Sequence, residues 1–398
     1  MRAVSIRKFR ISWTIALVML VVAPQSRGED APDERLSAPP ANQWVAVDID
    51  WDKTLAGFRE DVKWVTSDGY SDNSFRDKTG EVLIRTGIKS ESAGWDPGFY
   101  TNTSVLWDPK TDTARVADVF RWGGGSYGGG RLLEGYHENP TPSPRHTWDG
   151  MAYVPDEDAL YLMFGATWRT ATRATDEAQR EIGTNEKSTW KFSFGDDKWT
   201  RIDDSVRRFW PSTSAVSPYS THLRHWPAGN KLLFFNNNGN RYAEFDLETQ
   251  RWKQVTDHDK SPMTLVKACS TWDAKRDLWV FRLGRDLATF DPKTRKFVKL
   301  PPCWDESRHW PERREGERRD PAMRWEAKGI VYIPKHDVYL VTGPTGNDTA
   351  VYDVEKGSWT PIAAGDIELV NGYLQYDPAT DLVLMNYQLR CYKLRYEP

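Results

Sequence analysis

The stretch YIPKHDVYLVTGP, from Tyr332 to Pro344, contains an aromatic residue, a short polar turn, an alternating apolar strand and a strand-breaking glycine. The same order of features, with a strand breaker that is not always glycine, occurs six times in the chain. The copies begin at Phe75, Tyr153, Trp226, Trp272, Tyr332 and Tyr376. Each copy predicts two antiparallel strands joined by a tight turn. Self-similarity with a period near 45 residues predicts a repeat architecture.

A second module follows most copies, in which an aromatic residue comes six positions after an aspartate. The pairs are Asp246 with Trp252, Asp291 with Phe297, and Asp353 with Trp359, and Ser193 with Trp199 occupies the same frame. This module predicts a second hairpin. Four antiparallel strands per unit, repeated six times, predict an all-β, six-bladed β-propeller in which each blade buries its faces against its neighbours.

The last copy predicts how the ring closes. Tyr376 to Glu397 spans the same 21 residues as Tyr332 to Asp353, so Tyr396-Glu397 is expected in the third strand of the last blade, where the chain stops. The segment Gln43 to Val47 resembles the missing fourth strand. We expect it to pair into the last blade and cover the edge that an open ring would expose.

The N-terminus predicts export. Basic residues precede an apolar stretch from Ile11 to Val22, and the small residues Ser26 and Gly28 follow, which is the layout of a secretory signal peptide. We therefore expect a signal peptide at 1–28, a Pro-rich linker at 29–42 and a single propeller domain at 43–398. The mature protein is expected to be secreted or periplasmic, with no membrane span, because the apolar stretch is too short to cross a bilayer.

Composition narrows the class of partner. The chain has 54 Lys+Arg, 57 Asp+Glu and a net charge of −3; removing 1–28 takes away five basic residues and no acidic one, which leaves −8. That balance argues against nucleic acid. The cysteines Cys269, Cys303 and Cys391 allow at most one disulfide, whose pairing stays open. No metal-ligand spacing is present, and no cofactor is predicted.

Two segments carry a family resemblance. PSPRHTWDGMAYVPDEDALYLMFGA, Pro142 to Ala166, is similar to the first half of a kelch repeat, and STWKFSFGDDKWTRI, Ser188 to Ile202, to the second half. The chain therefore resembles the kelch-repeat β-propellers, a superfamily that includes the central domain of galactose oxidase. The kelch double glycine is mostly reduced to one glycine or replaced. The resemblance implies an architecture and not a chemistry, because this fold hosts both enzymes and scaffolds.

Insertion lengths predict the functional face. From the first-strand aromatic residue to the third-strand aspartate, or the serine in that frame, blades three to six take 20, 19, 21 and 21 residues, but blade one takes 33 and blade two takes 40. The extra residues fall between strands two and three, on the same rim as the long crossings between blades. Long loops gathered around an axis are a typical place for a ligand site.

Several residues on this rim are candidate ligand contacts. The glycine-rich run from Gly123 to Arg131 is either a flexible crossing or a lip that presents Tyr127 and Arg131 to a ligand. Trp168 and Arg169 lie in the enlarged loop of blade two, where an exposed indole would stack on a sugar ring.

A second group of candidates enters the first strands. Arg145 and His146 enter strand one of blade two, Arg324 and Trp325 enter that of blade five, and Tyr219 has the equivalent position in blade three. These arginines either brace neighbouring blades or hold an acidic or hydroxyl-rich ligand. His146 and Tyr219 are the candidate catalytic residues. In the same region, His222 is expected to reach the channel alone, because His225 is an odd number of strand positions away.

Two classes of function remain open. The first is an exported binding propeller that recognises a glycan or a protein through its long-loop face, with carbohydrate favoured because this rim combines Trp, Tyr, Arg and Asn. The second is an enzyme acting on acidic carbohydrates, of epimerase, mutarotase or lyase type, with the Arg/His/Tyr cluster at the channel mouth. The kelch resemblance adds weight to the second class because sialic acid mutarotase is such a propeller. The sequence does not decide whether the protein is catalytic.

Overall fold

The computed structural model describes residues 39–55, 63–67, 73–85, 88–91, 99–100, 104–118, 122–123, 131–132, 134–143, 145–146, 149–163, 166–167, 176–185, 188–202, 204–210, 221–236, 240–265, 268–284, 286–302, 329–343, 349–362, 364–365, 372–387 and 390–398. All of them belong to one compact unit, Ala38–Pro398. The predicted signal peptide and most of the predicted linker lie outside the described residues.

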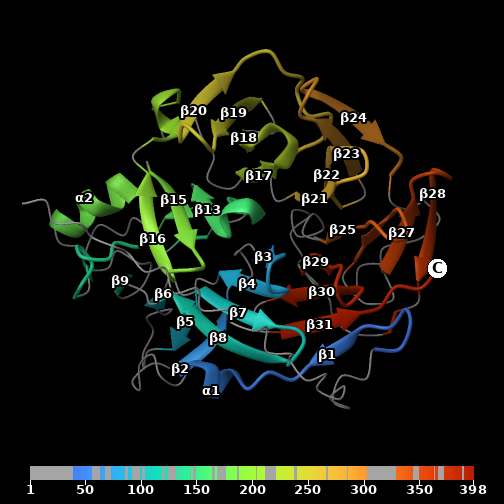
Figure 1. Cartoon of the computed structure of the whole chain (residues 1–398), viewed down its shortest axis with the longest axis horizontal. Helices are drawn as coiled ribbons and strands as arrows, with labels where there is room; N and C mark the ends of the chain where they lie inside the picture. The colour runs from blue at the N-terminus through green and yellow to red at the C-terminus, as the bar shows by residue number, and fades with distance from the viewer. Residues whose placement is uncertain are drawn as a thin grey trace, which may run out of the picture. The chain divides into compact units, whose positions relative to one another are not determined.

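Six four-stranded antiparallel sheets form the blades of a β-propeller, as the repeats predict (Figure 1). The first strand of each blade is innermost, and neighbouring first strands contact one another. These strands are β3 (Asn73–Arg76), β12 (Met151–Val154), β17 (His222–Trp226), β21 (Cys269–Asp273), β25 (Ile330–Ile333) and β29 (Tyr373–Asp377). The second strands are β4 (Glu81–Arg85), β13 (Ala159–Met163), β18 (Lys231–Asn236), β22 (Leu278–Leu283), β26 (Val338–Val341) and β30 (Leu382–Tyr387).

The outer half of each blade is the second predicted hairpin. Its inner strands are β7 (Ser104–Asp108), β15 (Thr189–Ser193), β19 (Arg241–Asp246), β23 (Asp286–Asp291), β27 (Thr349–Asp353) and β31 (Arg390–Leu394). The outermost strands are β8 (Thr113–Asp118), β16 (Lys198–Ile202), β20 (Arg251–Val255), β24 (Lys296–Leu300), β28 (Ser358–Ile362) and, in the last blade, β1 (Val45–Val47).

The spacing of aromatic residues in the second hairpin reflects cross-strand pairing. Trp252 lies opposite Phe245, with ring centroids 5.0 Å apart, and the equivalent residues of three other blades pair in the same way. Such pairs fill the wide outer gap between neighbouring blades with apolar surface. Trp199 and Trp252 are almost fully buried. Most of the tryptophans in these outer hairpins therefore serve blade packing.

The turn between the first and second strands ends on a residue with left-handed backbone in every blade. The φ angles are +79° at Gly80, +46° at Asp158, +50° at Asn230, +58° at Asp277, +53° at Asp337 and +57° at Asp381. Only Gly, Asn and Asp occur there, because these residues adopt this conformation at the lowest cost. The turn chemistry thus fixes the length of the first hairpin.

The N-terminal strand closes the ring, as predicted. Val45 of β1 pairs with Lys393 of β31, and the backbone N–H of Asn42 donates to the carbonyl of Arg395 at 2.8 Å. Trp44 is buried in the same apolar cluster as Tyr396 and donates from its indole nitrogen to Thr349 at 3.0 Å. The contacts of the propeller thus include the last residues of the predicted linker.

The predicted third strand of the last blade was displaced by a few residues. Tyr396-Glu397 was expected in this strand, but β31 ends at Leu394 and the two residues follow it. Val383 pairs with Leu394 where Tyr339 pairs with Tyr352 in blade five. The reason is that only two residues separate β30 from β31, whereas seven separate β26 from β27.

The insertions carry small elements of their own. β2 (Lys63–Ser67) precedes blade one and pairs with β5 (Ile88–Glu91), which also pairs with β6 (Phe99–Tyr100). β11 (Arg145–His146) precedes blade two and pairs with β14 (Ala166–Thr167). Both pairings join a crossing between blades to a connection between strands two and three. They confirm that these insertions gather on one rim.

The remaining elements are short. They are α1 (Trp51–Leu55), α2 (Asp176–Asn185) in the enlarged loop of blade two, and the paired strands β9 (Trp122–Gly123) and β10 (Arg131–Leu132). Single 3₁₀ turns lie at Pro155–Glu157, Val206–Arg208 and Pro227–Gly229. Among the described residues, no helix has the length and apolar character needed to span a membrane.

Candidate functional site

A cavity of about 380 Å³ lies among the innermost strands of the propeller. Its wall takes residues from the first strand of all six blades, and it reaches the exposed turns that follow them, at Pro155, Pro227, Pro334 and Pro378. This volume falls within the range of small-molecule sites, which are concave and mainly apolar with a few placed polar groups. The axial cavity is therefore the candidate site.

A ring of equivalent residues encircles the cavity, one from each blade. Each is the last but one residue of its first strand and belongs to the second cross-strand pair counted from the turn. The strand register therefore defines the set. The members are Phe75, Tyr153, His225, Trp272, Tyr332 and Tyr376, and all line the cavity. Blade three was misaligned by one residue in the sequence repeat, which placed Trp226 in this position. The conserved spacing is from the ring residue to the left-handed turn residue, and His225 has that spacing to Asn230.

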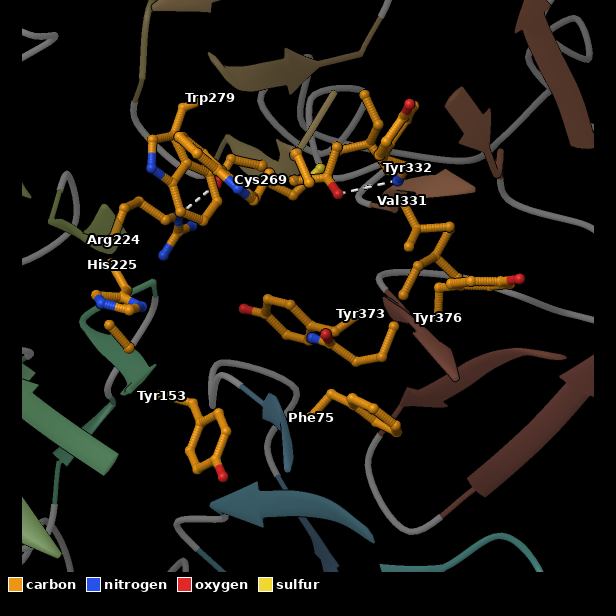
Figure 2. A pocket seen from close by; sticks show the side chains of 18 of the residues that line it. Phe75, Tyr153, Arg224, His225, Cys269, Trp279, Val331, Tyr332, Tyr373 and Tyr376 are labelled. Atoms are coloured by element: carbon orange, nitrogen blue, oxygen red, sulfur yellow. Dashed lines mark hydrogen bonds between the residues drawn. The ribbon is translucent and has the colours of Figure 1, made fainter. Parts of the chain in front are cut away.

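The three ring tyrosines turn their hydroxyls away from the cavity (Figure 2). Each hydroxyl donates to the left-handed aspartate of its own turn: Tyr153 to Asp158 at 3.0 Å, Tyr332 to Asp337 at 2.9 Å and Tyr376 to Asp381 at 2.8 Å. Burial, and then the hydrogen bond to the carboxylate, raise the pKa of each tyrosine above its ordinary value of 10. These three tyrosines therefore offer the cavity aromatic surface and not hydroxyl groups, whereas Tyr373, a lining residue outside the ring, turns its hydroxyl toward the cavity in Figure 2.

The same aspartates tie neighbouring blades together. Arg76 of blade one donates to both carboxylate oxygens of Asp158 in blade two, at 2.7 and 2.6 Å, and lowers the pKa of Asp158 to about 2. Arg276 of blade four holds Asp337 of blade five in the same bidentate way and keeps the pKa of that carboxyl well below its ordinary value. These pairs hold the ring residues at fixed positions around the cavity.

Arg224 of β17 lies at the cavity wall, and one end of its guanidinium, Nη2, donates no hydrogen bond to a described residue. Nε donates to the Ser270 hydroxyl, and Nη1 donates to the carbonyls of Asp149 and Leu223 at 3.0 and 2.7 Å. Nη2 lies 3.5 Å from the Asp149 carboxylate, which pairs with its charge but is too far for a good hydrogen bond. No described residue accepts a hydrogen bond from Nη2. Figure 2 shows this end of Arg224 turned toward the cavity.

His225 follows Arg224 and is the one ring member with a titratable imidazole. It is 9% exposed, and no described residue forms a hydrogen bond with its ring. Burial lowers its pKa to about 4, against a weaker opposite effect of Asp156 and Glu157. The imidazole is therefore neutral at physiological pH, and one nitrogen is a donor while the other is an acceptor. It lies on the same side of the cavity as Arg224 (Figure 2).

His222, a predicted ligand contact, lies in a buried cluster beside the cavity. It is 1% exposed, and its Nε2 lies 2.5 Å from the carbonyl of Leu265. Its Nδ1 lies 3.3 Å from the carboxylate of Asp149, whose backbone carbonyl accepts from Leu223. His222 contributes to the joint between blades two and three and is not part of the described cavity wall.

An arginine braces blades in the manner considered for Arg145 and Arg324. Arg282 of β22 is fully buried and donates from Nε to Gly284 of its own blade at 3.0 Å. Its Nη1 donates to the carbonyls of Gly329 and Thr342 in blade five, at 2.5 and 2.7 Å. Arg282 thus acts in blade packing, whereas Arg224 also brings one end of its guanidinium to the cavity wall.

The other predicted site residues fall into two groups. The backbones of Arg145, His146 and Arg131 are described: Arg145 pairs with Thr167, just before Trp168 in sequence, and Arg131 pairs with Gly123. The prediction that Arg145 and His146 enter strand one of blade two is wrong, because they form the separate strand β11, and strand one begins at Met151. Six candidates lie outside the described residues, namely Tyr127, Trp168, Arg169, Tyr219, Arg324 and Trp325.

Sequence reasoning missed Arg224 and His225 as site residues. The available signal was the repeat itself, because five of the six ring positions had been identified as the aromatic residue that opens each copy. When the repeats of blades two and three are aligned on Pro155 and Pro227, which follow the first strands, His225 is equivalent to Tyr153. A histidine in an otherwise aromatic position then points to a polar role.

The described residues contain no group of three His, Cys, Asp or Glu side chains suited to hold a metal ion. Cys269 and Cys391 are buried free thiols, and burial raises the pKa of Cys391 well above its ordinary value. Cys303 lies outside the described residues. Besides aromatic, guanidinium and imidazole groups, the cavity wall includes the polar residues Ser270, Thr271, Tyr373 and Gln375.

Fold and site together define a six-bladed β-propeller with an axial cavity, a class of fold that commonly mediates binding. No protein-family model matches the chain, and no curated protein matches it in sequence.

Proposed function

We propose that the protein is an exported, kelch-type binding propeller that holds a carbohydrate in its axial cavity. The observation that carries this proposal is the ring of aromatic residues around a cavity of about 380 Å³, interrupted on one side by Arg224 and His225. Aromatic faces pack against the apolar face of a sugar ring, while a few fixed polar groups bind its hydroxyls.

Binding accounts for this wall better than catalysis on an acidic sugar. A general base works best with a pKa near the operating pH, and the pKa of His225 is about 4. Asp149 is already engaged with His222 and Arg224. The enzyme alternative depends on His146, Tyr219, Arg145 and Arg324, and its test is product analysis on any sugar that binds. A protein ligand on the long-loop face is the other alternative.

The export proposal rests on the N-terminal sequence alone. Secretory processing would remove residues 1–28 and leave the closing strand β1 in the mature chain. N-terminal sequencing of the protein recovered from the medium or the periplasm should give a start near Glu29. Recovery of the protein in the cytoplasm with Met1 in place would refute export.

A matched tryptophan pair tests the cavity. Trp272 and Trp226 are both half-buried and pack against the same apolar cluster, but only Trp272 lines the cavity. Screening the purified chain against a glycan array, followed by calorimetry on the hits, should show that Trp272→Ala weakens sugar binding by about five- to thirtyfold, which corresponds to the loss of about 1–2 kcal/mol of aromatic contact.

Trp226→Ala controls for a general loss of packing and should bind the same sugar with unchanged affinity. Equal loss of affinity in both variants would contradict binding in the axial cavity. If no glycan binds the unmodified chain, the carbohydrate proposal fails.

A further inference from the structure

We infer that Arg224 and His225 form a polar subsite for hydroxyl groups of a neutral sugar. The inference rests on the proposed function, because it names the part of the sugar that the axial cavity recognises. It deepens that proposal in two respects. It assigns the recognising residues, and it selects neutral sugars over the acidic ones that the sequence also left open.

The first step is the donor capacity of Arg224. Three of its five N–H groups are taken by Ser270, Asp149 and Leu223, which fix the guanidinium plane. The two N–H groups on Nη2 have no acceptor among the described residues, and the side chain is only 8% exposed. Nη2 is not among the buried atoms that lack a partner, and Arg224 lines the cavity, so a ligand oxygen at this position would add a charge-assisted hydrogen bond.

The second step is the neighbouring imidazole. His225 is more than nine-tenths buried, lines the cavity and has no hydrogen bond to any described residue. Because it is neutral, one of its nitrogens accepts a hydrogen bond. One hydroxyl group of a ligand can accept from Arg224 Nη2, and another can donate to His225. The hydroxyl groups of a sugar can act in both ways.

The third step is the charge of the wall. Among the described lining residues, Arg224 is the only cation, and Asp149 and Asp77 are both acidic. Asp149 already pairs with Arg224. At the mouth, desolvation and the neighbouring Asp377 raise the pKa of Asp77, so the surroundings already oppose its negative charge. A carboxylate on the ligand would add a further anion to this wall, whereas a hydroxyl adds none.

The test compares neutral sugars with their uronic acids. Calorimetry at pH 7 would use glucose, galactose and mannose, with glucuronate and galacturonate as charged counterparts, at low and high salt. At least one neutral sugar should bind at least tenfold more tightly than its uronate, with an affinity that does not depend on salt. A tighter uronate whose affinity falls with salt would overturn the neutral subsite.

His225→Phe isolates the subsite from the fold. Phenylalanine already occupies this ring position in blade one, as Phe75, so the variant should keep the melting temperature. It should bind the neutral sugar at least tenfold more weakly. His137→Phe, on an exposed histidine paired with Glu177, is the matched control and should bind normally.

The outcomes separate the two proposals. Unchanged affinity in His225→Phe, together with weakened affinity in Trp272→Ala, would overturn the subsite and leave the axial carbohydrate site intact. Absence of binding by the unmodified chain to all five sugars and to a glycan array would overturn the proposed function itself. Arg224→Gln gives a second reading: it keeps a donor but removes the fork, and it should weaken binding even where its fold is intact by circular dichroism.

Discussion

At the scale of single residues, the features of the site follow from polar groups held in an apolar surrounding. His225 keeps a neutral imidazole because burial disfavours its charged form, while Arg224 lies beside the carboxylate of Asp149. Arg224 is positioned by the hydroxyl of Ser270 and the backbone carbonyls of Asp149 and Leu223, and His225 by its burial among the innermost strands. Their availability to a ligand is therefore a property of the assembled ring and not of the strand β17 alone.

The lowered pKa of His225 predicts how stability depends on pH. In the unfolded chain its pKa returns to about 6.5, so the unfolded state binds the proton first as the pH falls. The free energy of unfolding should therefore decrease between about pH 6.5 and pH 4, by about 3 kcal/mol from this group. Urea denaturation at pH 7 and pH 4 measures the decrease, and His225→Phe should reduce it by that amount. An identical pH dependence in the variant would contradict the buried, neutral imidazole.

At the scale of elements, the first hairpin of each blade depends on a left-handed turn residue that also receives contacts from outside the turn. Asp337 accepts from Tyr332 of its own hairpin and from Arg276 of the preceding blade. The one residue Asp337 therefore adopts the left-handed conformation of the turn, accepts the hydrogen bond of the ring tyrosine and forms an ion pair between two blades. This multiple use explains why aspartate recurs at the position where glycine would relieve backbone strain most simply.

Substitution of Asp337 should separate these roles. Asp337→Asn keeps an acceptor for Tyr332 and a residue suited to left-handed backbone, but it loses the ion pair. Asp337→Ala loses all three and should lower the free energy of unfolding by about 2–3 kcal/mol, with about half of that loss in Asp337→Asn. Chemical denaturation at pH 7 measures both. Equal stability of the two variants would show that the ion pair with Arg276 carries the whole effect.

The ion pair between Asp337 and Arg276 also makes stability depend on pH. Here the stabilising form is a charged carboxylate, whereas for His225 it is a neutral imidazole. The pKa of Asp337 is lower in the folded than in the unfolded state, so its stabilising contribution is present above about pH 4 and is lost as the pH falls further. The loss from His225 comes at higher pH. Acid unfolding of Asp337→Asn should therefore match the unmodified chain between pH 7 and pH 5 in shape and differ from it only below.

At the scale of the whole molecule, stability depends on a joint between the two ends of the chain. β1 supplies the outermost strand of the last blade, and Asn42 exchanges hydrogen bonds with Glu397 at 2.7 and 3.0 Å. A ring of blades that bury their faces only against neighbours has no free edge once this strand is in place.

Removal of the closing strand should open that edge. A chain that begins at Asp48 should melt at a lower temperature and aggregate, because β31 then presents unpaired backbone groups and Trp44 no longer covers the apolar cluster of the last two blades. Addition of a peptide with residues 39–50 should restore the melting temperature in calorimetry. If the truncated chain melts like the intact one, the closing strand is not needed for the ring.

The sequence determined the number of blades, the two hairpins in each and the strand that closes the ring, because these depend on local periodicity, turn residues and aromatic spacing that repeat along the chain. It placed β31 and blade three slightly out of register, because strand ends depend on pairing with neighbours. Only the tertiary structure showed that Phe75, Tyr153, His225 and three further residues from distant repeats surround one cavity. It also showed that an arginine end and an imidazole lie at that cavity, since burial and hydrogen-bond partners are set by the contacts between blades and not by the order of residues within one.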